Sequence, residues 1–464
     1  MCVVRERLII RHSIQQIRAI LIVFAFILFV VHTMLPTYPG AWLLDGISIL
    51  LLISTFFGIS KFNLFLSSFF LVMTVVVGWT NDVYWGEIIH GFSYMVKLLL
   101  FICIVPIIAM PIQEFIPNIQ RFIQLASKKI SPRNVVNYTS FMLANLTNLA
   151  SLPISMSIFS STDSKKTPDL SFSSIIVRSF GIAMVCTPLG AAVAFAIDIV
   201  DTNFISLLGV NAFIVVLGLV ISTLLESRNK WDAPQEETKE VTFHKGDWLF
   251  LARMLIPIVV YFVILTLIDE NLPLGMMELI VLSILPFTLI WSMALQKVKG
   301  WWIYLHVLVK DRAPTMFNQF SVIISAGLTI YTIELVGLNH QILSILPGAS
   351  SDYAAIIYIP VIIVVILLLA IIGVHQFVAI VFVGEVIDPS ILGINHVVFA
   401  STLLVGFVSG MIASTFSGAN ILMSNLSPPM SPYVFAKSNY VFTMMFIGAS
   451  VVYLILVNYL LVSA

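Results

Sequence analysis

Long apolar segments separated by short polar breaks run through the whole chain, and they constrain its fold more than any other feature. A transmembrane helix needs about 20 mostly apolar residues, and many segments approach or exceed that length. The segments are 19–35, 42–60, 62–79, 91–110, 135–160, 171–199, 206–225, 248–268, 274–295, 314–336, 353–373, 374–391, 395–425 and 438–461. The sequence therefore predicts an all-α polytopic membrane protein.

The composition excludes several other classes of protein. Of the 464 residues, 59% are hydrophobic and 10% are charged, and the mean hydropathy is +1.05. A soluble globule this apolar would lack the charged side chains that cover a wetted surface. We therefore exclude a soluble enzyme, a disordered chain and a nucleic-acid binder, and expect the lipid bilayer as partner. The run 19–35 lacks the small-x-small cleavage pattern of a signal peptide, so we expect a retained first helix.

The positions of Lys and Arg predict the topology, because cytoplasmic loops carry an excess of both. With the N-terminus in the cytoplasm, the first four helices bring the basic stretch Arg121–Arg133 to that side. If 135–160 then crossed the membrane, Lys165 and the basic central linker would lie outside. A re-entrant hairpin at 135–160 keeps them inside, and a second hairpin at 353–391 does the same for Lys437. We expect about 11 crossing helices plus two hairpins in a cell membrane, with both hairpins covered by protein or water-filled space.

The two halves of the chain then have the same order of elements. Each has three crossing helices, a hairpin, an interrupted helix and a final helix. Because the halves begin on opposite sides, they are inverted repeats, which are typical of secondary transporters. The predicted parts are an N-terminal segment with the first helix at 1–41, a first repeat at 42–225, a cytoplasmic linker at 226–247 and a second repeat at 248–464.

The interrupted helices 171–199 and 395–425 carry polar, Pro and Gly residues at matching places. Pro188 removes a helical N–H group, and Gly190 and Gly418 allow backbone conformations that other residues resist. Unwinding exposes N–H groups that favour an anion and C=O groups that favour Na⁺. A simple kink in a packed bundle is the structural alternative. The predicted substrate-binding residues here are Thr187, Pro188, Gly190, Ser414, Thr415, Ser417, Gly418 and Asn420.

Polar residues also gather at the predicted hairpin turns. Asn145, Thr147, Asn148 and Ser151 of the first hairpin, together with Asn420, form the predicted Na⁺ site; their structural alternative is to cap the turn. His375, at the second turn, is expected to contact substrate or a proton, and the alternative is a structural imidazole. Arg178 is expected to extend its charged end toward the cytoplasmic interface.

At Gly373-Val374-His375 through Gly384-Glu385, and at Ser414-Thr415-Phe416-Ser417-Gly418-Ala419-Asn420, the chain resembles the ion transporter superfamily of bacterial secondary carriers. The second motif is similar to the Ser/Asn/Thr substrate motifs of the dicarboxylate carriers, whereas Cys186-Thr187-Pro188 departs from them. The resemblance implies elevator-like alternating access that moves a small organic anion with Na⁺ or H⁺. We expect no other cofactor, and a homodimer stays open.

Two other functions remain as alternatives. A cation/proton antiporter on the same fold would use His375 and Glu385. A membrane-embedded enzyme or lipid-handling scaffold would need a nucleophile, phosphate loop or metal cluster, and the sequence contains no Walker-type loop, HExxH, GxGD or GxSxG motif. We therefore expect a protein that is not an enzyme.

Overall fold

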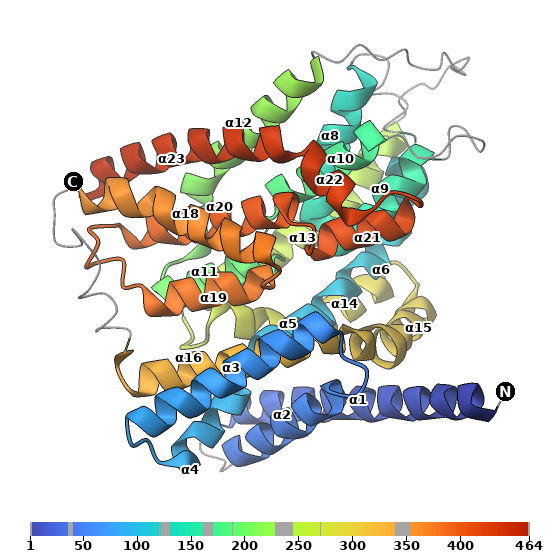
Figure 1. The fold of residues 1–464 in the computed structure, drawn as a ribbon. Helices are drawn as coiled ribbons and strands as arrows, with labels where there is room; N and C mark the ends of the chain where they lie inside the picture. Colours follow the sequence, from blue (N-terminus) through green and yellow to red (C-terminus); the bar gives the residue numbers. More distant parts are fainter. Residues whose placement is uncertain are drawn as a thin grey trace. The chain divides into compact units, whose positions relative to one another are not determined.

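The computed structural model describes residues 2–35, 40–119, 121, 130–160, 170–187, 189–227, 245–269, 271–338 and 353–462. The secondary structure of these residues is helical throughout, without a strand (Figure 1). Eleven helices in this part of the chain are long and apolar enough to cross a bilayer. The prediction of an all-α multi-pass membrane protein is confirmed. The eleven candidates are not the eleven predicted crossings, because 132–159 and 354–372 are among them, whereas 42–60 and 171–199 contain only shorter helices.

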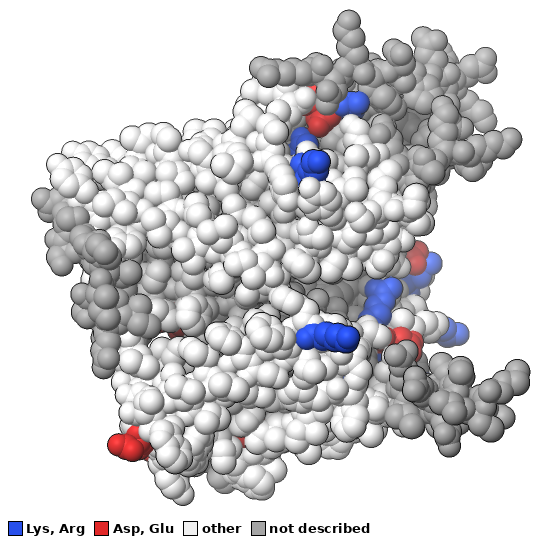
Figure 2. Space-filling model, viewed as in Figure 1, with Lys and Arg blue, Asp and Glu red and all other residues white. Residues whose placement is uncertain are grey.

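The chain folds into two compact units, and each unit takes segments from both halves of the sequence. Unit 1 comprises Met1–Ile107, Met277–Pro347 and Gly384–Asp388, and unit 2 comprises Ile108–Met276, Gly348–Val383 and Pro389–Ala464. Since each unit mixes the two halves, the repeat boundaries inferred from the sequence stay a prediction. Figure 2 shows broad uncharged areas on the visible face of the helices, as expected for surfaces that contact lipid.

Unit 1 is a bundle of helices from the start and the middle of the chain. A buried arginine, Arg18, donates hydrogen bonds to the carbonyl oxygens of Ser54 and Phe57 over 2.7 and 2.6 Å. These bonds reach carbonyls at the end of α2, where the regular helical hydrogen bonds run out. The hydroxyls of Thr74 and Thr329 lie 3.0 Å apart between α3 and α16. The main helices of this unit are α1 (Cys2–Met34), α2 (Ala41–Thr55), α3 (Lys61–Thr80), α4 (Trp85–Ile88), α5 (Val96–Ile104), α14 (Met276–Ala294), α15 (Val298–Val307) and α16 (Phe317–Leu335).

Unit 2 contains both predicted hairpins and both predicted interrupted helices. Its helices are α6 (Ala109–Gln113), α8 (Pro132–Thr147), α9 (Ser151–Ser160), α10 (Leu170–Ala183), α11 (Ala191–Val200), α12 (Phe204–Ser227), α13 (Lys245–Asp269), α18 (Ala354–Ile372), α19 (Gln376–Val386, whose last residues belong to unit 1), α20 (His396–Ala413), α21 (Gly418–Leu426), α22 (Pro432–Ser438) and α23 (Tyr440–Val462).

The first hairpin is formed by α8 and α9, which return the chain to the end of unit 2 where it started. Near the start of α8, Arg133 contacts Glu226 in the last turn of α12 over 2.8 Å. The chain turns after Thr147, and at Met156 of α9 it reaches Ser173, near the start of α10. Since Arg178 of α10 bonds the same Glu226, both limbs lie at one end of the unit. The segment 132–159 is therefore a hairpin of two helices, as predicted for 135–160, although its length and composition would suit a span.

The second hairpin is formed by α18 and α19, with its turn at Gly373. This glycine has φ +109°, a left-handed conformation that suits a residue without a Cβ. Figure 1 shows α19 running back from the turn. The first limb packs closely on α20, since a Cβ at Gly410 would lie 2.7 Å from the Cβ of Ala370 and one at Gly406 would lie 2.9 Å from Ile366. The small-xxx-small pair Gly406 and Gly410 permits this approach, and sequence analysis missed it.

The two interrupted helices run in opposite directions. Residues Val200 and His396 meet at one end, where the His396 Nδ1 lies 3.1 Å from the Val200 carbonyl oxygen. Further along, Gly181 packs directly against Ile412. The final helices α12 and α23 are also antiparallel, because α12 contacts Tyr453 near its start and Phe446 further along. Inverted repeats require that equivalent helices of the two halves run antiparallel.

Candidate functional site

The first interruption separates α10 from α11, and Pro188 within it lies outside the described residues. The side chain of Thr187 is fully buried, and its hydroxyl donates a hydrogen bond over 3.1 Å to the carbonyl oxygen of Asn145 at the tip of the first hairpin. The Nδ2 of Asn148 donates to the Leu189 carbonyl oxygen over 2.9 Å. Two predicted groups, the break and the hairpin tip, are thus brought together.

The side chains of the other predicted Na⁺ ligands at the first hairpin do not all contact the break. The Nδ2 of Asn145 donates to Phe141 over 3.0 Å, and the hydroxyl of Thr147 donates to Leu143 over 2.8 Å. Both groups therefore bond back to carbonyls of their own helix, close to the end of α8. Ser151 is buried at the start of α9, and within the described chain its Oγ has no hydrogen-bond partner.

The second interruption separates α20 from α21, and hydrogen bonds among its own residues and one bond to α18 close it. The Ser417 hydroxyl accepts a hydrogen bond from the Asn420 amide over 3.1 Å and caps α21. The Ser414 hydroxyl donates to the Ala370 carbonyl oxygen over 2.5 Å. The Nδ2 of Asn420 donates to the carbonyl oxygens of Ile412 and Ser414 over 3.0 and 2.9 Å. Its Oδ1 is buried and has no partner among the residues that the structure describes.

The two closures have the same geometry. The Thr187 hydroxyl binds the carbonyl oxygen of Asn145, which lies two residues before Thr147, the last residue of α8. The Ser414 hydroxyl binds the carbonyl oxygen of Ala370, which lies two residues before Ile372, the last residue of α18. In each repeat, a hydroxyl at the broken helix therefore binds the last turn of the first hairpin limb. This match was not visible in the sequence, because residues from separate segments make each bond.

The two breaks differ in the space beside them. A Cβ at Gly418 would meet no atom within 4 Å, and Phe416 is 49% exposed next to the half-buried Thr415. A Cβ at Gly190 would instead lie 3.0 Å from the Thr187 carbonyl oxygen. Neither glycine has a positive φ, so the conformational reason given for them is wrong. Close packing explains Gly190, while Gly418 leaves room at the start of α21.

His375 lies at the turn of the second hairpin, as predicted. Its Nδ1 accepts a hydrogen bond from the Phe377 amide over 3.4 Å, and the two rings stack with centroids 5.7 Å apart. These contacts are those expected of a structural imidazole, which was the alternative role predicted for His375. Glu385 belongs to unit 1 and His375 to unit 2. No group of three His, Cys, Asp or Glu side chains that could hold a metal ion occurs in the described part of the chain.

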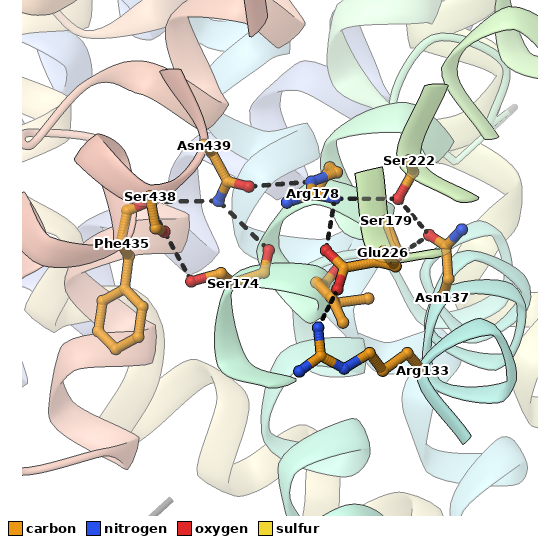
Figure 3. A network of polar contacts seen from close by, with 11 residues as sticks. Arg133, Asn137, Ser174, Arg178, Ser179, Ser222, Glu226, Phe435, Ser438 and Asn439 are labelled. Atoms are coloured by element: carbon orange, nitrogen blue, oxygen red, sulfur yellow. Dashed lines mark hydrogen bonds and ion pairs between the residues drawn. The ribbon is translucent and has the colours of Figure 1, made fainter. Parts of the chain in front are cut away.

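A buried polar network joins four helices of unit 2 (Figure 3). Arg178 is 4% exposed, so the expectation that it extends to the interface is wrong. It donates hydrogen bonds to Asn439 over 3.0 Å and to Glu226 over 3.1 Å, and Glu226 also binds Arg133 over 2.8 Å. Burial of an arginine is tolerated because a carboxylate and hydrogen-bond acceptors surround it. Sequence analysis missed Glu226 because it stands where the apolar run ends.

Asn211 of α12 is a second residue that sequence analysis missed. It is fully buried, and its Nδ2 donates a hydrogen bond over 2.8 Å to the carbonyl oxygen of Val185, in the first break. A single amide inside the apolar run 206–225 was the available signal. Buried polar side chains in a membrane span are costly unless they have partners.

Comparisons with known proteins give a likeness of fold. No family model matches the chain, and no curated protein matches it. The crystal structure of the Alcanivorax borkumensis YdaH transporter, described as revealing an unusual topology, matches with a TM-score of 0.52 at 13% identity. The match covers 81% of this chain and 87% of that chain. At this identity, the likeness shows a shared fold.

Proposed function

We propose that the chain is a secondary active transporter that moves a small organic anion of the carboxylate type across the cell membrane by alternating access, coupled to Na⁺ or H⁺. One observation carries the proposal: in each of two antiparallel broken helices, a hydroxyl at the break donates a hydrogen bond to a backbone carbonyl near the tip of a hairpin. Broken helices in inverted repeats are the usual place for substrates and coupling ions in such carriers. The fold shared with a structure described as a transporter supports the proposal.

The second break is the proposed place for the substrate carboxylate. The start of α21 presents backbone N–H groups and the positive end of a helix dipole, both of which favour an anion. Two observations support this assignment: there is room beside Gly418, and Thr415 next to it is half-buried. Hydroxyl and amide groups, rather than charged side chains, surround the break. Ser414, Ser417 and Asn420 shape it through their hydrogen bonds.

Neutral oxygen atoms are the proposed ligands of a coupling Na⁺. The Asn420 Oδ1 and the Ser151 Oγ are buried, and neither has a partner within the described residues. A buried acceptor without a partner costs free energy, and a bound cation would remove that cost. Asn145, Thr147 and Asn148 would then position the hairpin tip instead of supplying side-chain ligands.

Uptake into lipid vesicles tests the proposal. Purified protein is reconstituted, and a panel of radiolabelled mono- and dicarboxylates is offered with an inward Na⁺ gradient, an inward H⁺ gradient or neither. We expect at least one carboxylate to enter faster under one gradient than in protein-free vesicles. Equal uptake of every compound with and without protein would count against a carboxylate carrier.

A cation/proton antiporter is the second candidate, and one observation in unit 1 favours it. The hydroxyl of Tyr94 donates a hydrogen bond over 3.0 Å to Glu334 and also interacts with Glu385. Two carboxylates that share one hydroxyl could exchange a proton for a cation. Dye-reported proton release on addition of Na⁺, lost in both Glu334→Gln and Glu385→Gln, would favour this candidate.

A further inference from the structure

Each break is held by one buried asparagine, and the two asparagines have the same pattern of contacts. Asn211 donates its Nδ2 to Val185 in the first break, and Asn420 donates its Nδ2 to Ile412 and Ser414 in the second. Both side chains are fully buried. Both also leave the Oδ1 without a hydrogen-bond partner in the part of the chain that the structure describes.

The arrangement differs from that of a purely structural asparagine. Asn458 of α23 is also buried, but its Oδ1 accepts from the Asn395 amide over 2.8 Å and its Nδ2 donates to Gly393 over 3.0 Å. Buried polar atoms in native proteins nearly always have a partner. An amide that uses its donor on a broken helix and keeps its acceptor free therefore points to a ligand for the acceptor.

We infer that α12 supplies a cation ligand, the Oδ1 of Asn211, at the first break, where a monovalent cation of the Na⁺ type binds. The assignment follows from the chemistry. An amide oxygen is a neutral, hard donor that suits Na⁺, and the Val185 carbonyl, which receives the Asn211 N–H, keeps a second lone pair. Since Val185 lies between α10 and α11, the bond also fixes the unwound backbone next to the ligand. The inference rests on the proposed function, and this cation is a second one, besides the ion assigned to the Asn420 Oδ1 and the Ser151 Oγ.

Thermal unfolding of the purified protein in detergent tests the site without transport. A cation that binds the folded state raises the Tm, so wild type should have a higher Tm in NaCl than in choline chloride at equal ionic strength. Asn211→Ala should lose part of this Na⁺-specific increase, because the proposed site at Asn420 and Ser151 remains. Asn458→Ala, the matched control, should unfold at a lower temperature but keep the increase. No Na⁺-specific increase in wild type, or an unchanged increase in Asn211→Ala, would overturn the inference.

A conservative variant separates the ligand from a structural role. Asn211→Asp keeps an oxygen at the Oδ1 position but cannot donate to Val185 in its ionised form. If the oxygen is a ligand, Asp should retain the Na⁺-specific increase in Tm that Ala loses. If Asn211 only ties α12 to the break, Asp should lose it just as Ala does, and the inference fails.

Uptake gives a second readout, and it separates the failure of the inference from that of the proposed function. With a transported carboxylate, Asn211→Ala should raise the half-saturating Na⁺ concentration about tenfold and leave the substrate KM at saturating Na⁺ within about twofold. Na⁺-driven uptake with the wild-type Na⁺ requirement in Asn211→Ala would reject only the inference. A Na⁺-specific increase in Tm without uptake of any carboxylate would instead contradict the proposed function and retain the cation site.

Discussion

The Thr187 hydroxyl donates a hydrogen bond over 3.1 Å to the carbonyl oxygen of Asn145, and this bond joins the first interrupted helix to the tip of the first hairpin. Ser414 makes the equivalent bond to Ala370 in the second repeat. The two bonds match in donor type, in acceptor and in the position of the acceptor near the end of a hairpin limb. Four segments of the chain are needed to build them.

Removal of either hydroxyl should stop transport and leave the protein in the membrane. Thr187→Val leaves the Asn145 carbonyl oxygen without its hydroxyl donor, at a cost of about 1–3 kcal/mol. Ser414→Ala removes one of two donors to the Ala370 carbonyl oxygen, which keeps the Gly373 amide. We expect initial uptake rates, normalised to inserted protein, to fall at least about tenfold. Thr402→Val is the matched control, because its buried hydroxyl bonds only Val398 of its own helix. Equal rates for Thr187→Val and Thr402→Val would show that the closure is not needed.

Asn420→Ala should abolish uptake. The substitution removes two hydrogen bonds to the end of α20 and the buried Oδ1 that we assign to the coupling ion. The control is Asn203→Ala, since Asn203 only accepts from the Ser206 amide near the start of α12. Uptake is measured in vesicles at equal protein density. Activity in Asn420→Ala comparable to that in Asn203→Ala would remove Asn420 from the site.

Glu226→Gln should destabilise unit 2 far more than Arg133→Gln. Without the carboxylate, two guanidinium groups lose their counter-charge, whereas loss of Arg133 leaves the pair of Glu226 with Arg178 intact. Breaking a buried ion pair from one side costs about 3–5 kcal/mol. Thermal unfolding in detergent should therefore give a much lower Tm for Glu226→Gln. Similar Tm values for the two variants would mean that the network does not hold the helices together.

Gly410→Val should prevent α18 from packing on α20. A Cβ at this position would already lie 2.7 Å from the Cβ of Ala370, and overpacking typically costs about 1–3 kcal/mol. Gly448→Val on α23 is the control, because a Cβ there meets no atom within 4 Å. We expect less folded protein by size-exclusion chromatography for Gly410→Val alone. A normal yield and Tm for Gly410→Val would contradict the close helix contact.

Charge placement in the sequence predicted the first hairpin, because only a hairpin keeps Lys165 on the same side as the other basic loops. The structure confirms the hairpin through Arg133 and Met156, which return to one end of unit 2. The interrupted helices were predicted for a similar reason, since polar residues, Pro and Gly stand out in an apolar run. Both signals are local in the sequence.

Contacts between distant segments could not be predicted in the same way. Asn211 and Glu226 look like ordinary polar residues of a span and its end, and their importance comes from Val185 and Arg178, which other helices carry. The role of Gly190 was also misjudged, because its packing against Thr187 matters and its backbone conformation does not. Tertiary neighbours, rather than local propensity, decide these positions.

Ion-coupled transport is measured as the steady-state accumulation ratio of a carboxylate in reconstituted vesicles. With an inward Na⁺ or H⁺ gradient, we expect an internal concentration above the external one, which an ionophore that collapses the gradient returns to equality. Asn420→Ala should never exceed equality. A wild-type ratio that stays at one under both gradients, for every carboxylate offered, would rule out ion-coupled carboxylate transport by this protein.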